Sequence, residues 1–216
     1  MNVSTFTVMA DDFVARDIGF VNSYPNKDGA SVPATAAFAG GDRNSFHRCS
    51  FIAYQDTVCD YKGRHYFEDC WIEGAIDFIY GYGRSLYSHC VLNSIGPGWL
   101  TAQAKVSWDH LAGFVFKDCT IQASTRTYLG RAWNQYATVV FSHSSMPNTI
   151  NPQGWEAWNA APSNGQHTTF VEDNCYGPGA DKTFRVNWMK NLSPQQLSWY
   201  TNMQFIGPDD WPSLQP

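Results

Sequence analysis

The sequence has no run of 18 consecutive apolar residues, so it predicts no membrane-spanning helix. It also has no run of lysine or arginine and carries a net charge of −5. This argues against nucleic acid as a partner, because neutralising phosphates needs clustered cations. Only 15% of the 216 residues are charged, and the 44% that are hydrophobic fit a globular protein. The first twenty residues have no basic region followed by an apolar stretch, so they do not predict a signal peptide.

Cysteine is present without the spacing of a zinc site. None of the six cysteines belongs to a Cys-x-x-Cys pair, so we expect no structural metal. Six cysteines are also too few for a disulfide scaffold in a chain of this size. Aromatic residues are abundant at 16%, with nine tryptophans. Such rings can build a large core, and they also suit a carbohydrate groove in which they stack on sugar faces.

One short phrase recurs and sets the expected architecture. Each copy has an aromatic or apolar residue, two mostly polar residues, a cysteine and then alternating apolar positions. The copies are residues 45–56, 65–77, 85–94 and 114–124, with a weaker copy at 139–150. Periods of about 20 to 50 residues indicate stacked repeats, and no copy has a helix-length amphipathic pattern. We therefore predict an all-β protein, a parallel β-helix formed by residues 1–216 as a single domain.

Stacking of the coils would place equivalent positions above one another. The four repeat cysteines should therefore form an inward-facing ladder of small buried thiols, namely Cys49, Cys70, Cys90 and Cys119. A disulfide such as Cys49–Cys70 stays open as an alternative on spacing alone. None of these cysteines has the surroundings expected of a nucleophile.

The C-terminal part of the sequence differs from the repeats. Ser193 followed by Pro194 predicts the N-cap and first residue of a short helix. We expect this helix to cap the end of the solenoid. Residues 205–216 should then trail along the side of the coils.

Two aspartates take the same place in adjacent copies. Asp56 lies seven residues after Cys49, and Asp77 lies seven residues after Cys70. Because parallel strands are ~4.8 Å apart, the two carboxylates should stack within or near hydrogen-bonding range. Two carboxylates that close cannot easily both ionise, so one can act as an acid and the other as a base or nucleophile.

Other roles for these carboxylates are calcium binding and capping of backbone N–H groups. Asp77, however, lies within the apolar run AIDFIYG, where burial without a function costs several kcal/mol.

Two further polar residues are candidates to assist the pair. Arg131 can make a two-point ion pair that keeps an aspartate ionised, although a lone arginine is more often a surface residue. Gln55, directly before Asp56, can donate to a developing oxyanion, although a glutamine beside a turn more often has a structural role.

Three segments, in their order and spacing, resemble motifs of the plant pectin methylesterases: YQDT (54–57), GAIDFIYG (74–81) and YLGRAW (128–133). Further segments that look like the family extend the resemblance over nearly the whole chain, among them residues 45–57, 101–105, 151–155 and 205–211. The resemblance implies a right-handed parallel β-helix enzyme that hydrolyses galacturonate methyl esters in pectin. It also implies that methanol is released without a metal or organic cofactor.

The resemblance assigns roles to individual residues. It makes Asp77 the nucleophile, Asp56 the general acid and base, and Arg131 the residue that holds the nucleophile. Gln55 corresponds to one of two glutamines that stabilise the oxyanion. The aromatic residues that the resemblance places along the substrate groove are Tyr80, Trp133 and Trp155.

Three departures from the family pattern stand out. The family's other glutamine lies 22 residues before Gln55, where this chain has Pro33, which has no amide to donate. Losing one such donor typically costs about 10²–10³ in rate unless another group, such as Gln103, substitutes. Tyr80 and Ala132 replace the usual Phe and Pro, changes that should be tolerated. The family's N-terminal strand-and-helix region has no counterpart, so we expect an N-terminally truncated chain.

Two alternatives to the esterase remain. One is an inactive pectin-binding β-helix protein, which Pro33 and the missing coils favour. The other is a different β-helix polysaccharide enzyme, a lyase or glycosidase, for which a calcium-binding carboxylate cluster would be expected. For the esterase, the resemblance implies methyl-esterified homogalacturonan as the substrate and a proteinaceous inhibitor as a further partner. It also implies a monomer located outside the cell, in the plant cell wall.

Overall fold

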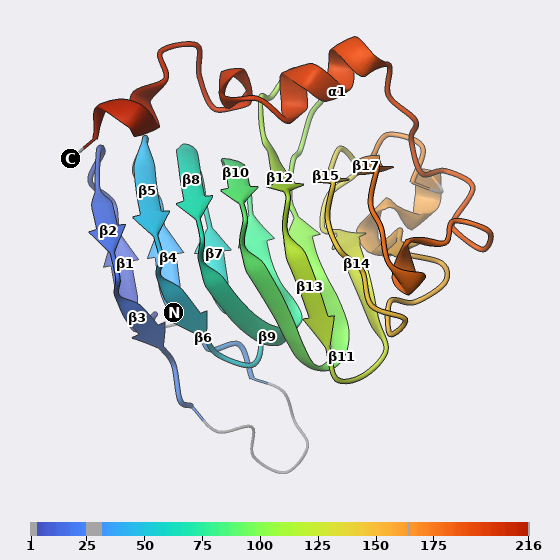
Figure 1. The fold of residues 1–216 in the computed structure, drawn as a ribbon, viewed down its shortest axis with the longest axis horizontal. Helices are drawn as coiled ribbons and strands as arrows, with labels where there is room; N and C mark the ends of the chain where they lie inside the picture. Colours follow the sequence, from blue (N-terminus) through green and yellow to red (C-terminus); the bar gives the residue numbers. More distant parts are fainter. Residues whose placement is uncertain (1–3, 25–31, 164, 216) are drawn as a thin grey trace.

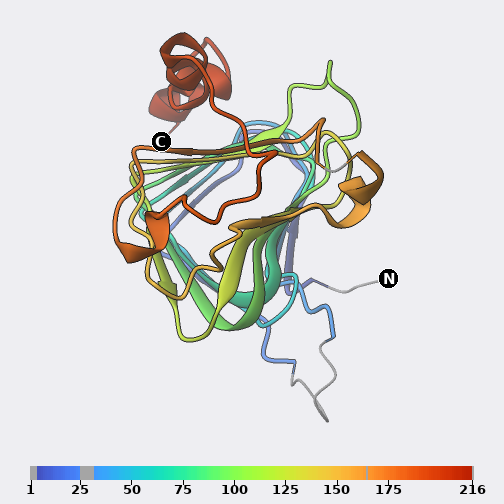
Figure 2. The same cartoon turned by 90° about the vertical axis from the view of Figure 1, so that its right-hand side faces the viewer.

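The computed structural model describes residues 4–24, 32–163 and 165–215. They form stacked coils in which the chain passes between two parallel sheets (Figures 1 and 2). The first sheet contains, in spatial order, β1 (Phe6–Val8), β4 (Ala37–Ala39), β7 (Val58–Asp60), β9 (Trp71–Gly81), β11 (Val91–Gln103), β14 (Thr127–Ala132) and β16 (Trp155–Glu156), extended by β3 (Gly19–Val21), β6 (Ser50–Ile52) and β13 (Thr120–Ala123). The second contains β2 (Val14–Arg16), β5 (Asn44–His47), β8 (Arg64–Glu68), β10 (Arg84–Ser88), β12 (Gly113–Lys117), β15 (Thr138–Ser142) and β17 (Thr169–Asp173).

Each coil turns from the second sheet to the first at a residue with positive φ. These corner residues have φ between 47° and 57° and are Asp17, Arg48, Asp69, His89, Asp118, His143 and Asn174. From the second coil on, a small side chain follows the corner, points inward and donates to the carbonyl oxygen two residues earlier. The repeat therefore conserves a turn geometry together with a small donor that satisfies the turn's carbonyl.

The predicted cysteine ladder is formed by these donors. Its four expected members are buried, and all six cysteines of the chain are free thiols. The ladder continues through Ser144 of the weaker copy and then through Cys175, whose side chains make the same contact with the residue two positions earlier. The sequence spacing did not identify Cys175 as a member of the ladder, because the insertion before it changes its distance from the preceding repeat.

A stack of aromatic rings fills the interior beside the second sheet. Consecutive ring centroids lie 4.4 to 4.9 Å apart along the series Phe46, Phe67, Tyr87, Phe116 and Phe141. Each ring comes from the same position of a successive strand, so the register of the parallel sheet produces the stack. Buried rings in this geometry stabilise each other beyond the burial of their surface.

The predicted C-terminal helix is present as α1 (Pro194–Tyr200). Ser193 is its N-cap, and Gln196 completes a capping box. The position of the helix differs from the expectation, because α1 and the segment after it lie along the side of the second sheet and not across the end of the coils (Figure 1). The reason is that this sheet has an apolar outer face, which includes Leu86, Val115 and Val140, and the C-terminal segment covers it.

Four short 3-10 helices complete the secondary structure of the described residues: η1 (Trp158–Ser163), η2 (Pro178–Ala180), η3 (Met203–Phe205) and η4 (Trp211–Leu214). None of the helices in the described residues is long and apolar enough to cross a membrane.

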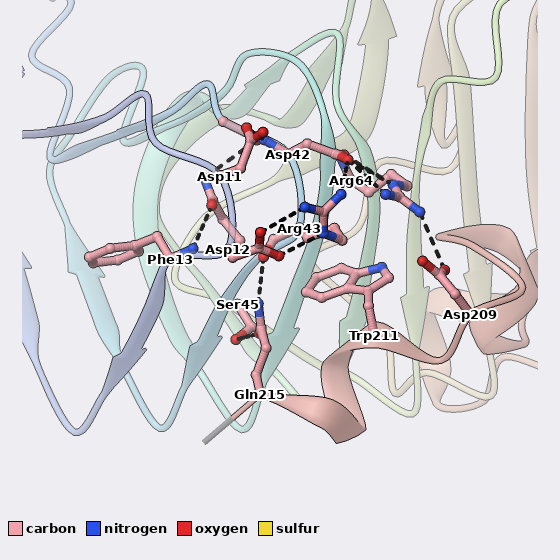
Figure 3. Close-up of polar contacts among 12 residues, drawn as sticks. Asp11, Asp12, Phe13, Asp42, Arg43, Ser45, Arg64, Asp209, Trp211 and Gln215 are labelled. Carbon is pink, nitrogen blue, oxygen red and sulfur yellow. Dashed lines mark hydrogen bonds and ion pairs between the residues drawn. The ribbon is translucent and has the colours of Figure 1, made fainter.

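The C-terminal segment runs back to the first coils (Figures 1 and 3). Gln215 donates through Nε2 to the carbonyl oxygen of Arg43 at 2.7 Å. Arg64 pairs with Asp42 at 2.7 Å and with Asp209 at 3.4 Å, which joins the segment to the corner of the coil beneath it. These contacts attach the C-terminal segment to the first coils, which are distant from it in sequence.

A buried ion pair fastens the polypeptide that follows β17. Arg185 donates through Nε and Nη2 to the two carboxylate oxygens of Glu172 at 2.7 and 2.9 Å, and both side chains are at most 3% exposed. Trp155 donates to the same carboxylate at 3.0 Å. Three hydrogen bonds therefore satisfy a carboxylate that has no access to solvent.

Replacing Arg185 by Ala should lower the free energy of unfolding by about 3–5 kcal/mol, because Glu172 is left as an uncompensated buried charge. The matched control is Arg48→Ala, which removes an ion pair of the same two-point geometry to Asp17 that is more than half exposed. That change should cost far less, because solvent screens an exposed ion pair. Urea unfolding measures both, and equal costs would contradict the account.

Candidate active site

Asp56 and Asp77 lie in adjacent coils of the first sheet. Asp77 is part of β9, and the N–H of Asp56 donates to the carbonyl oxygen of Ile76 at 3.0 Å. Both have positive φ, 61° and 48°, a conformation that aspartate adopts more readily than most residues. Asp77 interrupts the alternation of β9, Asp56 lies in the bend between β6 and β7, and both line the same cavity. The structure therefore brings together the two carboxylates that the repeat spacing paired.

Arg131 reaches Asp77 across an intervening strand. Its Nε donates to Oδ1 at 2.9 Å and its Nη2 to Oδ2 at 2.6 Å. Arg131 is on β14 and Asp77 on β9, with β11 between them. The residue of β11 in register with Arg131 is Ala102, which also lines the cavity. Its methyl group leaves room for the guanidinium to pass over the strand.

Two indole rings hold the guanidinium of Arg131 from its faces. The Cζ atom lies 3.8 Å from the ring centroid of Trp99 and 3.8 Å from that of Trp158. Trp99 is itself fixed, because its Nε1 donates to Glu156 at 2.9 Å. Cation–π contacts with tryptophan are stronger when solvent is largely excluded, and the side chain of Arg131 is only 15% exposed. Arg131 is therefore held by its charge partner and by its ring contacts together.

Sequence reasoning did not identify Trp99 or Trp158. No local spacing points to them, since Trp99 meets Arg131 through the pairing of β11 with β14. Trp158 starts η1 in a strained backbone conformation with φ of 38°. The signal that could have found them is the excess of tryptophan in the composition, which shows that such residues exist but not where they lie.

The two carboxyl groups differ in acidity. The pKa of Asp56 is raised to about 7, chiefly by burial and then by the charge of Asp77, against the lowering effects of Arg131 and a hydrogen bond with Gln55. Burial also raises the pKa of Asp77, but the hydrogen bonds and charge of Arg131 oppose it and keep the rise smaller. Asp77 therefore gives up its proton first, and Asp56 keeps its proton to near neutral pH.

Replacing Asp56 by Asn should stabilise the fold at pH 8 and leave it nearly unchanged at pH 4. The folded pKa of about 7 lies above the unfolded value, so the stability that the protonated carboxyl contributes is lost as pH rises from about 4 to 7. A rise of about three pKa units corresponds to an upper limit of ~4 kcal/mol, so we expect a gain of roughly 2–4 kcal/mol. Chemical unfolding of both proteins at the two pH values measures it, and an equal effect at both would contradict the assignment.

The cavity at this site has a volume of about 230 Å³ and is lined by Gln55, Asp56, Asp77, Tyr80, Ala102, Arg131, Trp133 and Trp158. It is smaller than the ~300–1,000 Å³ that enclose drug-sized ligands. A cavity of this size suits one sugar unit, with the rest of a polymer outside. The hydroxyl group of Tyr80 is hydrogen bonded to Thr35 at 2.9 Å, which fixes that ring at the wall.

The position expected for Trp155 is corrected by the structure. Its side chain is 1% exposed and stacks on Phe170, with ring centroids 4.4 Å apart, so it belongs to the core. The physical reason is the phase of β16, in which Trp155 faces inward beside Gly130 and only the third residue after it, Trp158, reaches the cavity.

The two residues considered for the second oxyanion donor do not line the cavity. Pro33 is half-buried and lies outside the residues that form its wall. Gln103 is fully buried, and its Oε1 accepts from the N–H groups of Lys105 and Thr138. Gln55 does line the cavity, and its side chain is hydrogen bonded with Asp56. Within the described residues, no group of three or more His, Cys, Asp or Glu side chains is arranged to hold a metal ion.

The sequence comparisons and the structure comparisons match this chain to the same family of proteins. A family model described as "Pectinesterase" matches residues 1–209. Three relatives from Arabidopsis thaliana are 37 to 41% identical over 210 to 221 residues, among them "Probable pectinesterase 55" at 38%. The alignments cover 96% of this chain but only 58 to 66% of those proteins.

Solved structures agree with the fold. "Pectin methylesterase from Carrot" superposes with a TM-score of 0.89 at 30% identity, covering 97% of this chain and 70% of that one. A pectin methylesterase in complex with a hexasaccharide has a TM-score of 0.76 at 26% identity, covering 95% of this chain and 72% of that one. The predicted parallel β-helix is confirmed.

Proposed function

Because the chain belongs to the pectinesterase family, we propose that it hydrolyses the methyl esters of galacturonate units in pectin. The observation that carries the proposal is the two-point ion pair of Arg131 with Asp77, in the same cavity as the carboxyl group of Asp56, whose pKa is raised. A positioned carboxylate and a neighbouring acid that keeps its proton to near neutral pH are the two groups that acyl transfer from an ester needs.

The reaction starts with attack on the ester. An oxygen of the Asp77 carboxylate bonds to the carbonyl carbon of the ester and forms a tetrahedral intermediate. When the intermediate collapses, the bond to the methoxy oxygen breaks, and Asp56 transfers its proton to that oxygen to release methanol. The galacturonate acyl group is then attached to Asp77 as a mixed anhydride.

The second half of the reaction uses the same two groups. Asp56, now ionised, takes a proton from a water molecule that attacks the acyl group. The anhydride bond breaks, the galacturonic acid unit that leaves gives its proton to the solvent and becomes a free carboxylate, and Asp77 is regenerated as an anion beside Arg131. Asp56 ends the cycle protonated, as it began.

The site has fewer side-chain donors for the oxyanion than the resemblance predicts. Gln55 supplies one side-chain amide, and Pro33 supplies none where the resemblance predicts a second. One missing donor costs about 10²–10³ in rate, so we expect slow turnover. The inactive pectin-binding protein is the second candidate function, and Pro33 is the observation that favours it.

The test is methanol release by the purified chain from highly methyl-esterified homogalacturonan. Each methanol should be matched by one new carboxylate, without new reducing ends or unsaturated products, and chelation of calcium should have no effect. Chain cleavage would instead support a glycosidase or lyase. Absence of methanol release from a folded chain that still binds the polymer would overturn the esterase in favour of the binding protein. The substitution Pro33→Gln, which introduces the second glutamine, would then show whether the missing donor is responsible.

The rings that hold Arg131 give a further prediction. Trp99→Leu should lower kcat about 30-fold, the equivalent of ~2 kcal/mol for a desolvated cation–π contact. The acidic limb of the pH profile should also move to higher pH, because a less firmly held Arg131 opposes the raised pKa of Asp77 less well. Trp108→Leu, at a tryptophan that is 79% exposed, is the matched control. An unchanged kcat and pH profile in Trp99→Leu would show that the contact has no positioning role.

We propose further that the chain acts as a monomer outside the cell, on homogalacturonan of the plant cell wall, and that a proteinaceous inhibitor can occupy its groove. The hexasaccharide bound to a related pectin methylesterase supports recognition of a polymer over several sugar units.

A further inference from the structure

The wall of the active-site cavity contains a phenolic hydroxyl group. Of the eight described residues that line the cavity, Tyr80 is the one whose side chain ends in a hydroxyl. Its Oη atom lies 2.9 Å from Oγ1 of Thr35, a residue that is only 2% exposed. Either oxygen of this pair can be the donor. The contact therefore holds the phenol in place and leaves one of the two hydroxyl protons for another acceptor.

The hydroxyl of Tyr80 lies beside the coil that carries Asp56. Tyr80 on β9 is in register with Cys59 on β7, and Thr35 comes directly before β4, the strand on the other side of β7. The phenol therefore reaches across β7 to meet Thr35. The backbone hydrogen bonds made by the residues on either side of Thr35 place it beside Asp56 in the neighbouring coil. The pair of hydroxyls is thus close to the acid of the site.

The hydroxyl of Tyr80 remains a donor at the pH values at which Asp56 ionises. Burial raises its pKa, and the neighbouring Cys59 and Asp56 add to the rise, so the group keeps its proton well above neutral pH. When Thr35 donates to Oη, the proton of Tyr80 can go to a second acceptor. The thiol of Cys59 is within hydrogen-bonding reach, but sulfur is a weak acceptor. An oxyanion is a far stronger one.

The same part of the site lacks a donor that the resemblance predicts. Pro33 stands where a second glutamine is expected, and it comes two residues before Thr35 in the same coil. Gln103 does not replace that glutamine, because it is fully buried outside the cavity wall. Tyr80 stands where the family pattern has Phe. The chain has therefore lost an amide and gained a hydroxyl on the same side of Asp56.

We propose that the hydroxyl of Tyr80 donates a hydrogen bond to the oxyanion that forms when Asp77 attacks the ester, and that Thr35 positions this hydroxyl. The inference rests on the proposed function and names a second oxyanion donor beside Gln55. No covalent bond forms or breaks at Tyr80. Its proton stays on the phenol oxygen while negative charge develops on the carbonyl oxygen of the ester, and the charge disappears when the methoxy group leaves. The neutral hydroxyl offsets part of the about 10²–10³ in rate that a missing donor costs.

The substitution Tyr80→Phe tests the proposal, because it removes the hydroxyl and keeps the ring in the cavity wall. The kcat for methanol release should fall about tenfold, and KM should stay nearly constant, since a donor to the oxyanion acts only in the transition state. Steady-state kinetics on methyl-esterified homogalacturonan measures both, with circular dichroism to verify folding. Tyr176→Phe is the matched control, at a tyrosine that is 60% exposed and lies outside the cavity, and its kinetics should equal those of the wild type.

Thr35→Val, which keeps the shape of the side chain, tests the positioning role. It should lower kcat about threefold without a change in KM, because one hydrogen bond that orients the phenol is lost. Thr35→Ser, which keeps the hydroxyl, should lose less. In the Tyr80→Phe background, Thr35→Val should have no further effect on kcat, since Thr35 acts through the hydroxyl that is already absent. A merely structural role of Thr35 would lower kcat equally in both backgrounds.

A kcat of Tyr80→Phe equal to that of the wild type would overturn the proposal. A rise in KM at constant kcat would also overturn it, because that result means that the hydroxyl only contacts the bound ester. Failure of the esterase would look different. No methanol release from either the wild type or Pro33→Gln would reject the proposed function and this inference with it. Methanol release by Pro33→Gln alone would keep the esterase and reject Tyr80 as a donor.

Discussion

Replacing Asp77 by Asn should reduce methanol release by at least about 10⁴-fold, since an amide cannot replace the carboxylate that attacks the ester. The substitution is mild for the fold. Asparagine also tolerates the positive φ of 48° at this position, and its carbonyl oxygen can still accept from Arg131. The loss should therefore appear in kcat, with little change in the affinity for pectin.

The measurement is methanol release by wild type and variant at equal concentrations, with circular dichroism to verify folding. Asp118→Asn is the matched control, because Asp118 also has positive φ, 55°, but lies at a corner outside the cavity. Its activity should equal that of the wild type. A variant Asp77→Asn that keeps a tenth or more of the activity would show that another group attacks the ester.

Replacing Arg131 by Lys should lower kcat by about 10²–10³-fold although the positive charge is kept. Lysine cannot make the two-point pair with Asp77, and its ammonium group cannot fill the space between the rings of Trp99 and Trp158 as the flat guanidinium does. Since Arg131 opposes the rise that burial causes in the pKa of Asp77, that pKa should increase further in the variant. The acidic limb of the pH profile should then move to higher pH.

The control for this second change is Arg126→Lys, at an exposed arginine outside the cavity. Profiles of kcat against pH for the three proteins separate a positioning effect from a loss of folded protein, because only the former shifts the limb. A profile of Arg131→Lys that is scaled down but not shifted would contradict the link between Arg131 and the ionisation of Asp77.

The repeat pattern predicted the parts of the site that depend on stacking. Because equivalent positions of successive coils lie above one another, the spacing from Cys49 and Cys70 was enough to pair Asp56 with Asp77. The cysteine ladder followed from the same rule and proved to extend to Cys175. Such predictions succeed because residues one repeat apart in the sequence of a solenoid are neighbours in space.

The misplaced residues lie where the period fails. After residue 124 the coils carry insertions, so the repeat period does not show whether the side chain of Trp155 points into the core or out of it. Trp155 is in the core, and Trp158 occupies the position in the cavity wall that was expected for Trp155. The contact of Trp99 with Arg131 depends on strand register across β11 and β14, which no local pattern encodes. The helix α1 was recognised from its cap, but its position depends on the apolar outer face of the second sheet.

The central claim is that the ester passes through an acyl group carried by Asp77, and partition of that group between water and hydroxylamine tests it most directly. Methyl- and ethyl-esterified homogalacturonan would be hydrolysed in a fixed concentration of hydroxylamine, with the uncatalysed reaction subtracted. Both alcohols leave before the partition, so the ratio of hydroxamate to free carboxylate should be the same for the two esters. A ratio that depends on the alcohol would mean that water attacks the ester directly, and would contradict the role of Asp77 as nucleophile.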